Sequence, residues 1–248
     1  MIVAAIRKDV WVLLRDRGAL ISLFVLPIIF IVAFGSMFRF GNQTGPLAGI
    51  TSFQVTVPGN AVLFGFFIAL TTAMSYVTER RLGTWRRLLA APVPRWQALL
   101  ATLVPYYVVG VAQLTFLFGI GALGFGMRVA GSVTALIVLS LAVVLCAVCL
   151  GLVFATFAST ERQLGGMASV VLLVMGLLGG CMFPRLIMPA TMRRIGHAVP
   201  HSWALDGYYD VLVRPGTSIA DIAPSLAALL LFATGFAAIG LWRFRFER

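Results

Sequence analysis

Two histidines are the residues of this chain whose spacing comes closest to that of a metal site. His197 and His201 are four residues apart, which would place two zinc ligands on one face of a helix. Pro200 would interrupt such a helix, and the only acidic residues nearby are Asp206 and Asp210. We therefore expect no metal at this position.

The remaining reactive side chains argue against catalysis by this chain. Cys146 and Cys149 have C-x2-C spacing, but they lie in an apolar stretch without a second ligand pair, and Cys181 stands apart. The charge-free apolar windows, the last of which runs from Ile222 to Trp242, contain no Asp, Glu, His, Lys or Arg, which argues against a membrane protease and against a proton relay. The one lysine, Lys8, follows no glycine-rich loop, so the chain lacks an ATP-binding P-loop. We expect it to be no enzyme and to hold no cofactor, with any ATP and Mg bound by a partner subunit.

A basic segment at 79–95 could bind a soluble partner. Leu82, Trp85, Leu88 and Leu89 recur in it at helical spacing, with arginines between them and prolines at its end. This pattern predicts a short amphipathic helix across the end of a helical bundle. The alternative is a basic loop of the kind that membrane proteins commonly carry on their cytoplasmic side.

The composition indicates which elements must position these residues. Of 248 residues, 60% are hydrophobic and 11% charged, and the mean hydropathy is +1.01. A soluble domain is usually about half apolar and about a quarter charged. The sequence therefore excludes a soluble globular protein, a disordered chain and a disulfide scaffold, and its net charge of +11 does not indicate a nucleic-acid partner. It predicts an all-α integral membrane protein in a lipid bilayer.

Six apolar windows are long enough for membrane-spanning helices, since about 20 residues cross the hydrocarbon core. The predicted spans are 19–38, 58–78, 97–126, 131–159, 163–184 and 221–242, in a single domain over 1–248. The third and fourth windows are longer than one crossing but shorter than two, so we expect long or tilted helices there. We expect no cleaved signal peptide, because the first apolar stretch is longer than a signal h-region and no A-x-A-like site follows it.

The basic residues predict the orientation of these spans. One side of the predicted topology carries 13 Lys and Arg residues and the other carries 6. The positive-inside rule therefore places both termini in the cytoplasm, with the protein in the plasma (inner) membrane. Residues 1–18 are predicted to form an amphipathic elbow helix on the cytoplasmic leaflet, since Val3, Ile6 and Val10 share one face while Lys8 and Arg15 share another. A cytoplasmic extension of the first span is the alternative.

The extracellular segment at 185–219 is too apolar for a solvated loop and too short for a domain. Trp203, Tyr208 and Tyr209 lie in it, Pro184 precedes it, and Pro189, Pro200 and Pro215 divide it. Two short re-entrant helices would bury these aromatic residues within protein. An interfacial helix anchored by the same aromatics is the alternative. Trp203 and Tyr208 are candidates for a gate.

Polar residues inside the spans could line a transport pathway. The candidates are Asn60, Tyr106 and Gln113. Among many phenylalanines they would suit a lipophilic or amphipathic substrate. Hydrogen bonding between helices is the alternative role, and we expect Asn60 and Gln113 to face protein rather than lipid. The small-residue runs at 165–169 and 176–180 permit close packing within the chain or across a dimer.

The basic segment, the spans and the extracellular segment together resemble the ABC-2 type transporter permeases, in particular the daunorubicin-type multidrug exporters. The local likeness is carried by Glu79, Arg80, Gly83, Thr84, Arg87 and Leu88. In that family this region is a coupling helix that docks into an ATP-hydrolysing subunit. The resemblance implies that the glutamate and arginines make polar contacts and that Leu88 fills an apolar notch. It also implies a re-entrant helical pair before the last span.

The predicted function is therefore that of an exporter's permease subunit, driven by a separate ATPase. Six spans would form a thin pathway wall, so we expect a second permease copy or a paralogue. The substrates would be drugs, antibiotics or lipids. Export of a lipid-linked polysaccharide is the alternative within the family, and an ATP-independent channel or secondary carrier is the alternative outside it.

Overall fold

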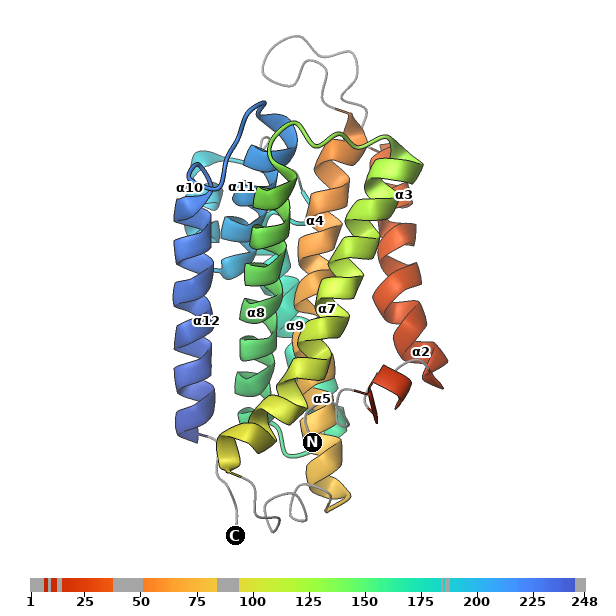
Figure 1. The fold of residues 1–248 in the computed structure, drawn as a ribbon, viewed down its shortest axis with the longest axis vertical. Helices are drawn as coiled ribbons and strands as arrows, with labels where there is room; N and C mark the ends of the chain where they lie inside the picture. Colours follow the sequence, from red (N-terminus) through yellow and green to blue (C-terminus); the bar gives the residue numbers. More distant parts are fainter. Residues whose placement is uncertain are drawn as a thin grey trace.

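The chain folds as a bundle of helices that run side by side along one axis (Figure 1). The structure, a computed structural model, describes residues 7–8, 10–12, 15–37, 51–83, 94–183, 185 and 188–243. Within these ranges every regular element is a helix and no strand occurs. The predicted all-α class is confirmed.

The first span contains a wide helical turn ahead of a proline. Three segments follow one another: α2 (Arg17–Leu20), a π-helical segment η1 (Ile21–Val25) and α3 (Leu26–Met37). Pro27 has no N–H to donate to the carbonyl of Leu23, four residues earlier. The wider turn and a bond from outside the helix accommodate this position. Of the elbow predicted over 1–18, residues 7–8, 10–12 and 15–18 are described, and all of them except Asp16 are helical.

The second span is an almost continuous helical column formed by α4 (Ser52–Phe66) and α5 (Ile68–Arg81), with Phe67 between them. It begins earlier than the apolar window at 58–78 because Thr51 caps it. The Thr51 hydroxyl accepts a hydrogen bond from the Gln54 N–H at 3.3 Å, and the Gln54 side chain accepts one from the Thr51 N–H at 3.3 Å. This reciprocal capping box satisfies donors that a helix start otherwise leaves unpaired.

Four long helices form the other spans: α7 (Arg95–Phe125), α8 (Val133–Phe157), α9 (Glu161–Gly179) and α12 (Ala223–Arg243). The long third window is one helix, α7, which runs obliquely across the bundle (Figure 1). Five of the described helical columns are long and apolar enough to cross a membrane, and Ile21–Met37 is a shorter apolar helix. The predicted six membrane-spanning elements therefore all occur as apolar helices.

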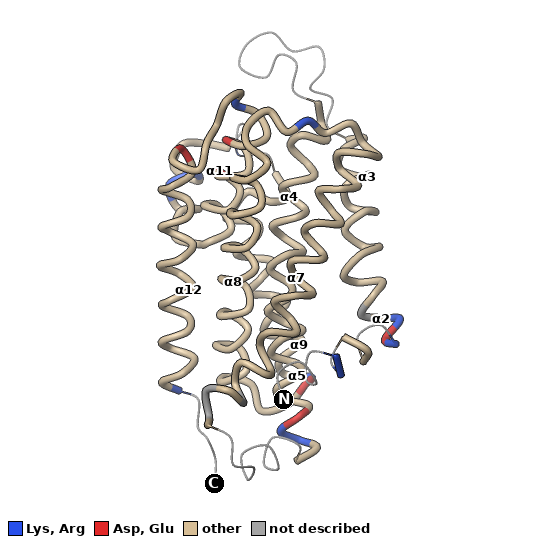
Figure 2. Tube along the Cα trace, viewed as in Figure 1, with Lys and Arg blue, Asp and Glu red and all other residues tan. Residues whose placement is uncertain are grey.

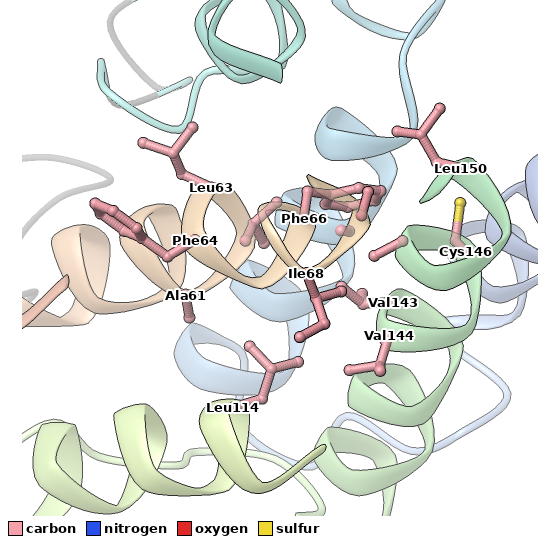
Figure 3. Close-up of a cluster of buried hydrophobic side chains, with 14 of the residues drawn as sticks. Ala61, Leu63, Phe64, Phe66, Ile68, Leu114, Val143, Val144, Cys146 and Leu150 are labelled. Carbon is pink, nitrogen blue, oxygen red and sulfur yellow. The ribbon is translucent and has the colours of Figure 1, made fainter. Parts of the chain in front are cut away.

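The core lies where α4, α5, α7 and α8 meet. Figure 3 shows its side chains, which include Phe66, Ile68, Leu114, Val144 and Leu150. Two of these helices approach closely at Gly151 of α8, where an added Cβ would lie 2.7 Å from the carbonyl oxygen of Ala69 on α5. Only glycine allows the two backbones to come this close.

Two further helices, α10 (Ala190–Gly196) and α11 (Pro200–Val213), lie between α9 and α12 in the chain and occupy one end of the bundle (Figure 1). The chain enters and leaves this pair at that same end, and α11 packs against α4, α8, α9 and α12. The pair corresponds to the two short helices predicted for 185–219. Backbone bonds tie it to the α7–α8 connection, where Gly131 N–H donates to Val211 and Ser132 N–H donates to Thr217.

Among the described residues, Lys, Arg, Asp and Glu lie towards the two ends of the bundle (Figure 2). The outward faces of the peripheral helices carry large exposed apolar side chains, among them Val170, Leu173, Val174, Leu230 and Leu231. Such a belt is costly in water and suited to lipid. The chain is a multi-pass membrane protein.

Candidate functional site

The residues predicted to couple to an ATPase begin on the last turn of α5. Glu79 and Arg80 lie on that turn, and Gly83 follows it in a left-handed conformation with φ of 72°. A residue with a Cβ would be strained at that backbone angle, so glycine is the residue that lets the chain turn away from the helix. Thr84, Arg87 and Leu88 lie outside the described residues.

Glu79 is bound to the N-terminal segment. The Lys8 ammonium lies 2.8 Å from the Glu79 carboxylate, and the Glu79 side chain is only 17% exposed. This ion pair joins the region of the predicted elbow to the end of α5. Lys8 was not predicted to belong to this site, and the only signal in the sequence is that Lys8 is the single lysine of the chain.

A second contact joins α5 to the start of α9. The Thr78 hydroxyl donates to the Glu161 carboxylate at 2.9 Å, and Arg81 lies 3.6 Å from the same carboxylate. Glu161 is in the first turn of α9, where a carboxylate is favoured by the helix dipole. Three separate segments of the chain are therefore linked around the last turn of α5. Glu161 was not predicted as part of this site either, since no nearby residue in the sequence indicates that it contacts α5.

The two polar pathway candidates of α4 and α7 are buried. Gln113 is fully buried, and its side-chain N–H donates to the carbonyl of Leu23 at 2.9 Å, the carbonyl that Pro27 cannot satisfy. The Gln113 Oε1 has no partner among the described residues. Asn60 is 3% exposed and donates to the carbonyl of Thr56 at 2.8 Å. The prediction that both side chains face protein is confirmed.

The space beside Asn60 is small. Asn60 lines a gap of about 10 Å³ between α3, α4 and the residues that follow α9. A volume of this size corresponds to about one water molecule, so a lipophilic compound would need the helices to separate before it could reach Asn60. Tyr106 lies partly buried on α7 and packs against the core.

The two gate candidates both lie on α11. Tyr208 is fully buried, with its hydroxyl 2.9 Å from the Ser140 hydroxyl on α8 and its ring 4.8 Å from that of Phe118. Trp203 is partly buried, and its indole N–H donates to the carbonyl of His197 at 2.9 Å. The Tyr208 hydroxyl thus joins α11 to α8, and the Trp203 indole joins α11 to the end of α10.

His201 occupies a position that the sequence did not predict. Its side chain is fully buried and its ring stacks on Phe66 with centroids 4.0 Å apart. Neither ring nitrogen has a partner among the described residues. The adjacent Gly179 of α9 makes room for it, since an added Cβ there would lie 2.5 Å from the His201 Cβ. His201 is thus packed between Phe66 of α4 and Gly179 at the end of α9.

A charged cluster lies near α10 and α11 at the end of the bundle. The Arg185 guanidinium, 6% exposed, contacts the Asp206 carboxylate at 2.8 and 3.0 Å. His197 lies 3.1 Å from Arg185 and 3.0 Å from Asp206. His197 and His201, considered above as zinc ligands, therefore have different surroundings and lie on different elements. Within the ranges described, no group of three or more His, Cys, Asp or Glu could hold a metal ion.

Two carboxylates near this cluster have shifted acidities. Partial burial raises the pKa of Asp210, an effect that the Arg214 guanidinium, 3.0 Å away, partly opposes. The backbone N–H and hydroxyl of Ser218 donate to Asp221 at 2.7 and 2.8 Å, and these bonds lower the pKa of Asp221. The two carboxylates do not form a catalytic acid–base pair, because Asp210 is paired with Arg214 and Asp221 accepts the bonds from Ser218.

The geometry thus defines a class: an all-α multi-pass membrane protein with a linked polar cluster at one end and a basic cluster at the other. The family model of the ABC-2 type transporter matches residues 2–213. The chain belongs to the ABC-2 type transporter family, whose members form the membrane component of transporters.

Three relatives with sequence identities between 26% and 29% are also permeases by name. The linearmycin resistance permease protein LnrN of Bacillus subtilis (strain 168) is 29% identical over 187 residues, covering 74% of this chain and 47% of that protein. The inner membrane transport permease YhhJ of Escherichia coli (strain K12) is 28% identical over 212 residues, covering 83% and 51%. The probable multidrug ABC transporter permease YbhR of the same strain is 26% identical over 178 residues, covering 71% and 48%. The chain spans about half the length of these relatives.

Proposed function

We propose that this chain is the permease subunit of an ATP-binding-cassette exporter that moves lipophilic or amphipathic compounds out across the plasma membrane. A separate ATPase subunit binds ATP and Mg and supplies the energy. Both termini and the end of α5 face the cytoplasm, and a second permease copy or a paralogue completes the pathway. Family membership and the names of the relatives, which include antibiotic-resistance and multidrug permeases, support this proposal.

The observation that carries the proposal is the linkage around the last turn of α5. Glu79 is paired with Lys8, and Thr78 is bonded to Glu161 on α9. A partner that displaces residues 79–95 would therefore act on the N-terminal segment, the second span and the fifth span together. This is the arrangement that a nucleotide-driven subunit needs in order to move several helices with one contact surface.

The apolar exterior of the bundle and the internal bonding of its buried polar side chains support an apolar substrate. The polar side chains Gln113, Asn60 and Tyr208 are engaged in bonds within the protein, and the exterior between the two ends is apolar. A compound that partitions into the bilayer could approach the chain through this exterior without first losing a hydration shell. A strongly charged substrate would find no counter-charge in the spans.

A pull-down tests the proposal directly. The detergent-solubilised full chain is used as bait, and wild type is compared with the triple variant Glu79→Ala/Arg87→Ala/Leu88→Ala. We expect wild type to recover a P-loop ATPase and the triple variant to lose it. Arg128→Ala is the matched control, since Arg128 is an exposed arginine at the opposite end of the bundle and should leave recovery unchanged.

Two results decide the outcome. ATP hydrolysis by the recovered complex that rises with added lipophilic compounds would identify candidate cargo. If wild type recovers no ATPase under conditions that preserve other membrane complexes, the exporter has no energy source and the proposal fails. Transport by the purified chain alone would then assign it to ATP-independent carriers or channels.

A further inference from the structure

A cavity of about 670 Å³ opens among the side chains of α10, α11 and Arg185. It lies at the end of the bundle where the α10–α11 pair is located (Figure 1). Ligand pockets commonly have volumes of about 300–1,000 Å³, so a polar headgroup fits here. Most of its lining is charged: Arg185, Arg193, Arg194, Asp206, Asp210 and Arg214.

The charges of this cavity do not balance. Asp206 is paired with Arg185 at 2.8 Å, and Asp210 is paired with Arg214 at 3.0 Å. Both acidic residues of the lining are thus already neutralised by one arginine each. Arg193 and Arg194 are exposed in the last turn of α10 and have no acidic partner among the residues that the structure describes. The cavity therefore carries two guanidinium groups that are available to an anion.

The wall of the cavity is rigid. Arg185 is almost completely buried and is held by the Asp206 carboxylate and by the carbonyl of Gly179 at 3.4 Å. The His197 Nε2 lies within hydrogen-bond distance of both Arg185 and Asp206 and can bond to one of them at a time, and the His197 ring contacts that of Trp203 with centroids 4.6 Å apart. A wall fixed in this way costs little further ordering when a ligand binds, which favours affinity.

The surface beside the cavity is apolar. Met192 and Ile195 are 42% and 53% exposed on the same short helix that carries Arg193 and Arg194. Exposed apolar and basic side chains side by side are typical of elements at the headgroup boundary of a bilayer. A free anion would use the arginines alone, whereas an amphiphile would use both kinds of side chain.

We propose that this cavity binds the phosphate group of an anionic amphiphile, with Arg193 and Arg194 as its ligands and the Met192–Ile195 side of α10 against the acyl chains. Guanidinium groups bind phosphate through paired, charge-assisted hydrogen bonds, which accounts for arginine at both positions. The phosphate is that of a lipid headgroup, and displacement of the lipid by soluble phosphate is the result that would reassign the site. This site goes beyond the proposed export function, and its occupancy does not depend on an ATPase.

Lipid binding to the purified full chain in detergent tests this site. Native mass spectrometry gives the apparent Kd for dioctanoyl phosphatidylglycerol, with dioctanoylglycerol, which has no phosphate, as the comparison lipid. We expect wild type to prefer the phosphate-bearing lipid. The variant Arg193→Gln/Arg194→Gln should bind it about tenfold more weakly, because each lost guanidinium removes charge-assisted bonds. Each single variant, Arg193→Gln or Arg194→Gln, should lose a smaller part of this affinity.

The matched control is Arg128→Gln, which removes one exposed arginine from another connection at the same end of the bundle. It should bind the lipid within about twofold of wild type, because Arg128 does not line the cavity and an exposed, solvent-screened charge contributes little. Thermal unfolding of every variant establishes that a loss of binding does not come from a loss of folding. Competition with sodium phosphate distinguishes the two sources, since displacement of the lipid assigns the site to soluble phosphate and retention assigns it to the headgroup.

Three results would overturn the proposal: equal binding of phosphatidylglycerol and dioctanoylglycerol, equal binding by wild type and the double variant, or an equal loss in Arg128→Gln. None of these bears on the pull-down of an ATPase. The binding site and the export function can therefore fail separately.

Discussion

The two ends of the bundle hold their charges in different ways. At the end of α5, Lys8 and Glu79 form a pair in which the lysine is 51% exposed, and Arg81 reaches Glu161 at 3.6 Å with its side chain 73% exposed. At the α10–α11 end, Arg185 is 6% exposed and is held by a carboxylate, a histidine and a backbone carbonyl. Exposed pairs are weak and easily exchanged, whereas buried, multiply bonded ones are costly to break.

This difference indicates a division of roles along the bundle. Contacts around the last turn of α5 can be made and broken at little cost, which suits a surface that a partner displaces. The α10–α11 end is fixed by burial and by backbone contacts to the α7–α8 connection, which suits a frame. Four substitutions can break or sharpen this comparison, and they follow from the largest expected change in stability to the smallest.

The largest effect is expected where α9 meets α11. A Cβ at Gly179 would lie 2.5 Å from the His201 Cβ and 3.1 Å from the Ser202 backbone nitrogen, so Gly179→Leu must push the two helices apart. We expect a loss of about 3 kcal/mol in the free energy of unfolding, at the upper end for overpacked sites. Thermal unfolding in detergent measures it. Gly166→Leu on the same helix is the matched control, because nothing lies within 4 Å of a Cβ there, and an equally large loss in that control would contradict the assigned contact.

The next effect concerns the ion pair that fixes the α10–α11 end. Arg185→Ala leaves the Asp206 carboxylate, 34% exposed, without its principal partner. Because water can reach Asp206 in part, we expect a loss of about 2 kcal/mol, less than the cost of breaking a fully buried pair. The control is Arg214→Ala, whose 76% exposed side chain pairs with Asp210 and should contribute well under about 1 kcal/mol. Equal melting temperatures for the two variants would show that burial of Arg185 does not matter.

A smaller effect is expected at the gate candidate of α11. Tyr208→Phe removes the hydroxyl that bonds to Ser140 while it keeps the ring against Phe118. We expect a loss of about 1 kcal/mol in stability, the usual net value of one hydrogen bond. Transport by the reconstituted complex should stay unchanged if the residue only joins α11 to α8. A fall in transport at unchanged stability would instead place Tyr208 in the gate.

The sequence predicted the spans because membrane burial requires long apolar stretches, and such stretches can be read without knowing the partners of any residue. The early start of α4 could also have been predicted, because Thr51 followed by Gln54 is a helix-capping pattern. The apolar windows take account of hydrophobic residues only, so they place the start too late. The Lys8–Glu79 and Thr78–Glu161 contacts were not predictable in this way. Each joins residues more than 70 positions apart, so it depends on how the helices pack.

The basic cavity could not be predicted for a related reason. Arg185, Arg193, Arg194 and Arg214 are visible in the sequence as charges on one side of the membrane. Only the fold shows that two of them are neutralised by Asp206 and Asp210 while the other two are not. Likewise, the expectation that Gln113 faces protein follows from its polarity, but its bond to the carbonyl beside Pro27 depends on the approach of α7 to the first span.

The smallest change in stability is expected at the Lys8–Glu79 pair, where it serves to separate stability from coupling. Lys8→Ala should alter the free energy of unfolding by about 0.5 kcal/mol, since the lysine side chain is 51% exposed and its charge is screened by solvent. If the pair positions the end of α5 for a partner, the same variant should still lower ATPase recovery in the pull-down.

The exchange Lys8→Glu/Glu79→Lys restores the pair with opposite polarity, so it should return stability to the wild-type value. It should not return recovery if Glu79 also contacts the ATPase, because that contact needs the negative charge at 79. Full recovery by the exchanged pair would mean that Glu79 acts only through Lys8, and unchanged recovery in Lys8→Ala would remove the N-terminal segment from the coupling path.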